Sequence, residues 1–174
     1  CRHWGEAEIH RRLCADPAGY LAFAADYLAD LTAGRAQLQM PAKQVLDDPD
    51  GGDFRLMPCV VRGPRGTLKT VKIIGTNRRQ TLLPGQITVG ELLVLDAAEQ
   101  FVRERFEACL LSSARTGLVA ALALGRLAPR ARRIAVIGAG RVGFYTALYC
   151  AVLGTIEQID IADHDHARAR DVAQ

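Results

Sequence analysis

The segment from Arg133 to Gly143 constrains this chain more than any other, because a short apolar run leads directly into a glycine-rich turn. It reads Arg-Ile-Ala-Val-Ile-Gly-Ala-Gly-Arg-Val-Gly, so β-branched residues are followed by a GxGxxG pattern. β-Branched residues favour a strand, and apolar residues at helical spacing follow from Phe144 to Ala151. The segment therefore predicts a strand, a tight turn and a helix in direct succession.

Each glycine of the pattern has a physical role. Gly138 permits the tight turn, Gly140 lets the backbone approach a pyrophosphate, and Gly143 lets the helix pack closely on the strand. The helix N-terminus then presents N–H groups and the positive end of its dipole to the phosphates. The predicted phosphate loop consists of Gly138, Ala139, Gly140, Arg141, Val142 and Gly143.

A second strand is predicted where isoleucines alternate with Asp160, and it ends at Asp163, about 20 residues after Gly143. An acid at this position accepts hydrogen bonds from the ribose hydroxyls and repels a 2′-phosphate. NAD is therefore the expected cofactor, rather than NADP. Three side chains nearby that are cationic or can become so weaken that preference: His164, Arg168 and Arg170. His164 is itself a predicted cofactor contact.

The chain is expected to be an α/β protein with two lobes. Residues 112–174 are predicted to begin a Rossmann lobe that is incomplete here, because two parallel strands are encoded and a complete fold has about six. Residues 1–111 are predicted to form an α+β substrate-binding and dimerisation lobe. Its predicted strands are residues 54–61, 68–75, 92–95 and 101–106, with turns at 62–66 and 97–100.

Local signals also predict the helix boundaries. Asp16 followed by Pro17 is typical of a helix start, and Gly34 is expected to end that helix. Ser112 is expected to cap the helix that precedes the phosphate loop and that runs toward Pro129. Residues 47–52 are expected to form a loop because of their Asp, Pro and Gly content.

Composition excludes several classes of function. The net charge of +3 and the 6% of aromatic residues argue against a nucleic-acid binder. No apolar run reaches the roughly 18 to 20 residues of a membrane span. Five cysteines without a CxxC pair favour reduced thiols and a cytoplasmic location. His164 and His166 lack a third ligand, so no metal is expected.

Motifs in a fixed order give the chain a resemblance to a known family. They cover most of residues 37–163 and comprise Met40–Lys43, Phe54–Pro58, Val71–Lys72, Leu92–Asp96, Leu111–Gly117 and the glycine pattern. In this order they resemble the N-terminal half of the ornithine cyclodeaminase/mu-crystallin family. Within that family, the lysine of the first motif is most similar to the N-(2-amino-2-carboxyethyl)-L-glutamate dehydrogenases.

The resemblance implies a homodimeric, bilobal enzyme that oxidises an amino acid or reduces an imine with a nicotinamide cofactor. Carried over by motif, Lys43, Lys72 and Arg115 surround the substrate carboxylate, and Arg115 also reaches the cofactor. Thr116 is implied to lie near the cofactor phosphates. Lys72 is expected to be catalytic as well, because a desolvated lysine can move protons.

Plainer interpretations of these cations stand beside the functional ones. Lys72 could face water from an edge strand. Arg115 could be a surface arginine or form a helix-packing salt bridge. Lys43 could be an ordinary exposed lysine.

Two departures from the family pattern qualify the resemblance. Lys43 stands where many members have arginine, so a bidentate clamp on the carboxylate can be lost. Arg55 stands where cyclodeaminases have a glutamate, which argues against simple ornithine cyclisation. The family's catalytic aspartate belongs to the second half of the Rossmann lobe, so no catalytic acid is assigned.

Three functions remain open at this stage: an NAD-dependent amino or imino acid oxidoreductase, an amino acid cyclodeaminase, and a non-catalytic cofactor-binding protein. The first is favoured. The identity of the amino acid cannot be predicted, and residues 1–174 alone are expected not to turn over substrate.

Overall fold

The computed structural model describes residues 1–49, 52–83 and 86–173. The chain divides into two compact units, the first made of residues 1–9 and 27–109 and the second of residues 10–26 and 110–174. The predicted lobe boundary between residues 111 and 112 stays a prediction, and residues 10–26, which were predicted in the first lobe, belong to the second unit. The assignment of a separate function to each lobe stays a prediction.

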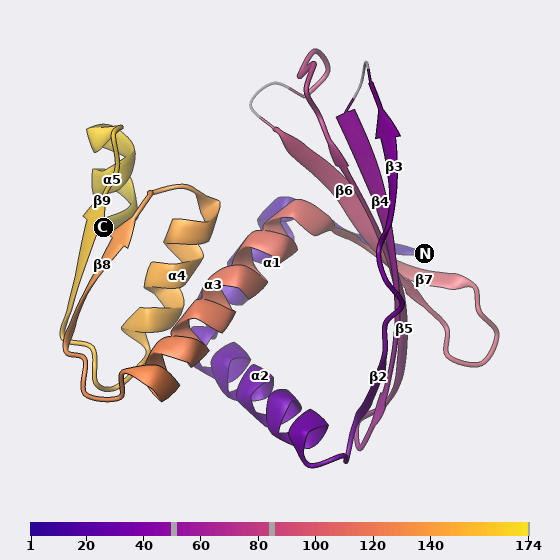
Figure 1. The fold of residues 1–174 in the computed structure, drawn as a ribbon, viewed down its shortest axis with the longest axis horizontal. Helices are drawn as coiled ribbons and strands as arrows, with labels where there is room; N and C mark the ends of the chain where they lie inside the picture. Colours follow the sequence, from indigo (N-terminus) through magenta and orange to yellow (C-terminus); the bar gives the residue numbers. More distant parts are fainter. Residues whose placement is uncertain (50–51, 84–85, 174) are drawn as a thin grey trace. The chain divides into compact units, whose positions relative to one another are not determined.

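The first unit is built on a seven-stranded sheet (Figure 1). Its strand order is β1-β7-β6-β5-β4-β2, and β3 also pairs with β4. The pairing is antiparallel throughout except between β1 and β7. The strands are β1 (Arg2–Trp4), β2 (Gln37–Gln39), β3 (Gln44–Asp48), β4 (Gly52–Gly63), β5 (Gly66–Thr76), β6 (Thr88–Leu95) and β7 (Val102–Glu107).

All four strands predicted between residues 54 and 106 are present, as β4, β5, β6 and β7. The β4–β5 turn falls within the predicted residues 62–66, and Gly66 adopts a positive φ of 102°. In the β6–β7 turn, the Asp96 carboxylate accepts the N–H groups of Ala98 and Glu99, both at 2.9 Å. These hairpins were predictable because their signals are local.

The predicted loop at residues 47–52 is shorter than expected. Asp47 and Asp48 belong to β3, where they pair with Asp53 and Gly52 of β4. Residues 50 and 51 lie outside the described residues. The ladder with β4 outweighs the weak strand preference of aspartate, because it satisfies the backbone of both strands.

The N-terminal helices begin and end at recognisable signals. α1 spans Glu6–Ala15 and α2 spans Pro17–Thr32. The Asp16 carboxylate accepts the Gly19 N–H at 2.8 Å, which confirms the predicted cap. Gly34 adopts a positive φ of 71° just after α2, as a helix stop requires.

The helix before the phosphate loop begins earlier than predicted. α3 spans Ala108–Leu127, so Ser112 lies inside it and the prediction that Ser112 caps it is wrong. β7 continues directly into α3, and the Glu107 carboxylate accepts the Cys109 N–H at 2.8 Å. This side chain supplies the acceptor that was expected from Ser112.

α3 is also apolar enough, by length and composition, to cross a membrane. That is weak evidence, since core helices of soluble proteins pass the same test. Ala114 and Ala121 of α3 are buried, and Gly117 lies against the backbone of α4. α3 therefore packs along one part of its surface.

The second unit contains the predicted strand-turn-helix-strand arrangement. β8 (Arg133–Ile137) pairs in parallel with β9 (Gln158–Ala162), and α4 (Arg141–Ala151) connects them. α5 (His166–Ala173) follows β9, as Figure 1 shows in yellow. The parallel pairing places the carboxyl ends of β8 and β9 side by side, which is where a dinucleotide binds in such folds.

Two tyrosines are among the largest side chains buried in the described part of this unit. Tyr145 and Tyr149 of α4 are each 1% exposed, and burial raises the pKa of Tyr149 to about 12. The Tyr145 hydroxyl lies 2.8 Å from Nδ1 of His10, a residue of α1. This contact anchors part of α1 to the helix that begins at the glycine loop.

Candidate functional site

The glycine loop connects β8 to α4 through a turn that requires glycine. Gly138 has a φ of 102°, a conformation that residues with a side chain rarely adopt. Its N–H donates to the Ala162 carbonyl at 2.7 Å. The turn is therefore fixed to the end of β9 from its first residue.

Gly143 is required for a different reason. A Cβ at this position would overlap the Gly138 carbonyl oxygen and would lie 3.5 Å from a methyl group of Val136. A side chain there would force α4 away from the turn. The prediction that Gly143 permits close packing of the helix on the strand agrees with this contact.

Gly140 is required neither by its backbone conformation nor by packing. Its φ of −78° suits any residue, and a Cβ added there would meet no atom of the described residues within 4 Å apart from its chain neighbours and its own helix backbone. Glycine there leaves the backbone accessible from outside, as the close approach of a pyrophosphate requires. The loop thus fits a dinucleotide phosphate.

The N-terminus of α4 also suits an anion. Gly140 is its N-cap, and no side chain within the described chain caps it by a hydrogen bond. Val142, in the first turn, is 43% exposed, so the turn is open to solvent. The positive end of the helix dipole and the first-turn N–H groups therefore face an accessible surface.

Asp163 lies beside the loop, as its sequence position predicted. One carboxylate oxygen accepts the Ala139 N–H at 2.7 Å, and the other accepts the Asp165 N–H at 2.8 Å. The pKa of Asp163 is lowered, first by the bond from Asp165, then by that from Ala139, and further by His164 and Arg168. The carboxylate is therefore ionised at neutral pH, the form that repels a 2′-phosphate.

His164 also lies next to this carboxylate. Its Nδ1 is 2.9 Å from Asp163 Oδ1, and its side chain is 93% exposed. The structure thus brings together the glycine loop, Asp163 and His164, all of which were predicted to contact the cofactor. The cofactor contacts themselves stay predictions.

Arg115 and Thr116 lie on α3. Arg115 is exposed, and no described residue forms an ion pair or hydrogen bond with its guanidinium. The helix-packing salt bridge is therefore not observed in the described part of the chain. The Thr116 hydroxyl donates to the Ser112 carbonyl at 2.7 Å, within the helix.

Lys72 lies on a central strand. β5 has β4 on one side and β6 on the other, and Lys72 pairs with Met57 and Leu92. This excludes the interpretation of Lys72 as an edge-strand lysine. Both of these strand neighbours are apolar, and a half-buried cation beside them is costly unless a hydrogen-bonding or anionic group compensates its charge.

Lys43 lies in the segment between β2 and β3 and is exposed. It belongs to the first unit together with Lys72, whereas Arg115 belongs to the second. The substrate roles of these three cations stay predictions.

Arg55 is part of a charged cluster that the sequence did not reveal. Its guanidinium donates from Nε and Nη2 to the Asp53 carboxylate, both at 2.5 Å. The Thr76 hydroxyl also donates to Asp53, and this bond, followed by those from Arg55, lowers the pKa of Asp53. In the strand registers, Arg55 and Lys72 lie on the same face of the sheet.

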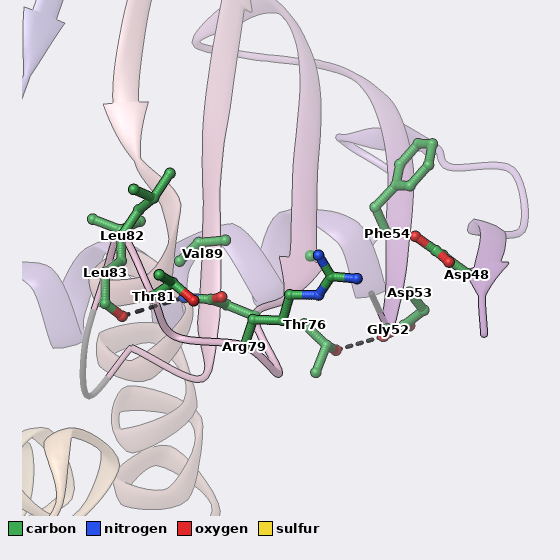
Figure 2. Close-up of a pocket in the computed structure, with 12 residues that line it drawn as sticks. Asp48, Gly52, Asp53, Phe54, Thr76, Arg79, Thr81, Leu82, Leu83 and Val89 are labelled. Carbon is green, nitrogen blue, oxygen red and sulfur yellow. Dashed lines mark hydrogen bonds between the residues drawn. The ribbon is translucent and has the colours of Figure 1, made fainter. Parts of the chain in front are cut away.

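A pocket of about 630 Å³ opens at the end of this sheet (Figure 2). Apolar side chains from β4, β6 and the loop after β5 line it, together with Asp53 and Arg79. Asn77 shapes that loop, since its amide donates to the carbonyls of Leu83 at 3.2 Å and Gln86 at 3.0 Å. None of the predicted substrate-binding residues lines the pocket.

The sequence of residues 9–174 matches the ornithine cyclodeaminase/mu-crystallin family. The chain belongs to this family. The resemblance inferred from the motifs is thereby confirmed, and it extends across both units. No curated protein matches the chain by sequence.

Solved structures confirm the fold of this family member. The match to an archaeal alanine dehydrogenase dimer with bound NAD covers 99% of this chain and 51% of the dehydrogenase chain, with a TM-score of 0.77 and 18% identity. The match to the iminosuccinate reductase of Paracoccus denitrificans in complex with NAD+ covers 98% of this chain and 53% of the reductase, with a TM-score of 0.73 and 18% identity. The match to a lysine cyclodeaminase covers 99% of this chain and 52% of the cyclodeaminase, also with a TM-score of 0.73 and 18% identity.

The chain therefore spans about half the length of these structures. The predicted α/β class, with an N-terminal lobe followed by the beginning of a dinucleotide-binding lobe, agrees with this coverage.

Sequence reasoning missed Asp53, Thr76 and Asn77. Asp53 and Arg55 are two residues apart on one strand, which puts them on the same face and could have indicated their pairing. Thr76 is remote in sequence, and its contact with Asp53 depends on the register of β4 against β5. No local signal could have shown that contact.

Proposed function

We propose that this chain is the N-terminal part of an NAD-dependent oxidoreductase that acts on an amino or imino acid. Membership of the ornithine cyclodeaminase/mu-crystallin family supports this proposal. So do two structural relatives, an alanine dehydrogenase and an iminosuccinate reductase, both with a bound nicotinamide cofactor.

The observation that carries the proposal is the phosphate loop together with Asp163. Gly140 leaves the backbone open where a pyrophosphate binds, and the ionised Asp163 lies at the carboxyl end of β9. We infer that this βαβ unit begins a Rossmann lobe in which the loop holds the pyrophosphate. NAD, when bound, supplies the hydride acceptor for C–N bond oxidation.

For the substrate, we propose that Lys43, Lys72 and Arg115 are carboxylate ligands. An amino acid carboxylate needs cationic donors, and Arg115 offers a guanidinium that no described residue engages. Lys72 is half-buried on a central strand, and a lysine whose ammonium is desolvated is suited to proton transfer. Thr116 and His164 are proposed as further cofactor contacts.

Arg55 favours the oxidoreductase over a cyclodeaminase. The resembling cyclodeaminases have a glutamate at this position, and Arg55 cannot replace its carboxylate. The Asp53 carboxylate lies nearby, but it is bonded to Arg55 and Thr76. The cyclodeaminase remains the second candidate because a lysine cyclodeaminase shares the fold.

We also propose a cytoplasmic homodimer that uses residues 54–106. Large apolar side chains on one face of the sheet are exposed, including Leu46 at 46%, Phe54 at 46% and Ile73 at 40%. A second copy would cover this face. The structural relative described as a dimer supports an assembly of two chains.

The test uses the full-length protein, NAD+ and a panel of amino acids. Net formation of NADH would support the oxidoreductase. Release of ammonia without net NADH would identify the cyclodeaminase, and cofactor binding with neither product would indicate a non-catalytic binder.

A further inference from the structure

The first two residues of the glycine loop are both fixed to the end of β9. The Gly138 N–H donates to the Ala162 carbonyl at 2.7 Å, and the Ala139 N–H donates to the Asp163 carboxylate at the same distance. Ala139 is 3% exposed and the Asp163 side chain is 6% exposed. A charge-assisted hydrogen bond in such a protected position is stronger than a neutral one.

The same carboxylate also fixes the start of α5. Its other oxygen accepts the Asp165 N–H at 2.8 Å, and Asp165 in turn accepts the Ala167 N–H at 3.0 Å. One side chain therefore connects the glycine loop, the end of β9 and the start of α5. Its removal would leave the buried Ala139 N–H without its acceptor.

We infer that Asp163 is a positioning residue for the phosphate loop, a role separate from any contact with the ribose. Ala139 immediately precedes Gly140, the residue at which a pyrophosphate would approach the backbone. A change in the orientation of the Ala139 peptide therefore changes the position of the phosphate-binding N–H groups. The inference rests on the proposed function, since it concerns the same cofactor site.

The experiment compares two nucleotides bound to the full-length protein: ADP, and 2′,3′-dideoxy-ADP, which lacks both ribose hydroxyls. Asp163→Ala is expected to weaken both by about tenfold or more, as the loss of a charge-assisted hydrogen bond predicts. Weaker binding of ADP with unchanged binding of the dideoxynucleotide would show a role limited to the ribose, and would overturn the inference.

Asp160→Ala is the matched control. Asp160 is also on β9, but it accepts from Arg133 at 2.7 Å and from Gln158 at 2.8 Å, rather than from the loop. Its removal should leave the affinity for both nucleotides unchanged, and an equal loss in both variants would contradict the inference.

A second measurement does not depend on nucleotide binding. In Asp163→Asn, which keeps the shape of the side chain but not its charge, the Ala139 amide should exchange its hydrogen faster than in the wild type. The Val136 amide, on β8, is the internal reference. Equal exchange at Ala139 in both proteins would overturn the inference, whereas wild-type protein that binds neither ADP nor NAD would overturn the proposed function.

Discussion

Gly117 of α3 lies directly against Tyr145 of α4. A Cβ at Gly117 would be 2.9 Å from the Tyr145 Cβ and 2.5 Å from the backbone nitrogen of Thr146. These distances are shorter than real Cβ contacts, and most of the atoms involved belong to the backbone. The two helices can therefore approach this closely only with glycine at position 117.

Gly117→Ala is expected to destabilise the protein by about 1 to 3 kcal/mol, the usual cost of overpacking a core. The control is Gly125→Ala in the same helix, where the new Cβ would meet only a Leu153 methyl group at 3.6 Å. That change should stabilise the protein by about 0.5 to 1 kcal/mol through helix propensity. Denaturant midpoints measure both, and equal midpoints would refute the packing argument.

NAD(H) is expected to bind more tightly than NADP(H), because the ionised Asp163 repels a 2′-phosphate. Hydrogen bonds lower the pKa of Asp163 below its ordinary value of about 3.9, so its carboxylate stays ionised from neutral pH down to about pH 4. The preference should weaken in part near about pH 6, where a phosphate monoester such as the 2′-phosphate loses one of its two charges, and should be lost as the carboxylate itself becomes protonated at lower pH. Titration with both cofactors at several pH values provides the test, and tighter binding of NADP(H) at neutral pH would contradict it.

Lys72→Ala and Arg115→Ala are expected to lower kcat/KM for the amino acid by about ten- to a hundredfold, since each removes a charge-assisted hydrogen bond worth about 1.5 to 3 kcal/mol. Arg115→Ala should also weaken NAD binding, whereas Lys72→Ala should not. Arg78→Ala, an exposed change, is the control. Equal activity of Lys72→Ala and Arg78→Ala would show that Lys72 has no role in the reaction.

Asp53 is expected to make stability depend on pH. Its folded-state pKa is lowered by the Thr76 and Arg55 hydrogen bonds, so its stabilising contribution is present above the unfolded pKa of about 3.9. That contribution is lost as the pH falls through the folded pKa. The denaturant midpoint of Asp53→Asn should therefore fall less steeply than that of the wild type below about pH 4. Parallel curves would mean that the cluster does not stabilise the folded state.

The parts of the fold that the sequence predicted correctly depend on local physics. The α2 cap at Asp16, the β4–β5 turn at Gly66 and the phosphate loop each follow from a side chain or a φ angle within a few residues. The start of α3 was predicted wrongly, because the acceptor that caps it comes from Glu107 at the end of β7. The serine at position 112 had the right chemistry for a cap but lay within the helix.

The sequence by itself determined the glycine loop, because glycine is the residue type that readily adopts the positive φ of Gly138 and that lacks a side chain at Gly143. It also determined the family, because the order of motifs is a property of the chain. Only the tertiary structure decided that Lys72 lies on a central strand and that Asp163 bonds Ala139. Strand order and hydrogen bonds between distant residues depend on how separate segments pair, and a local pattern does not specify that pairing.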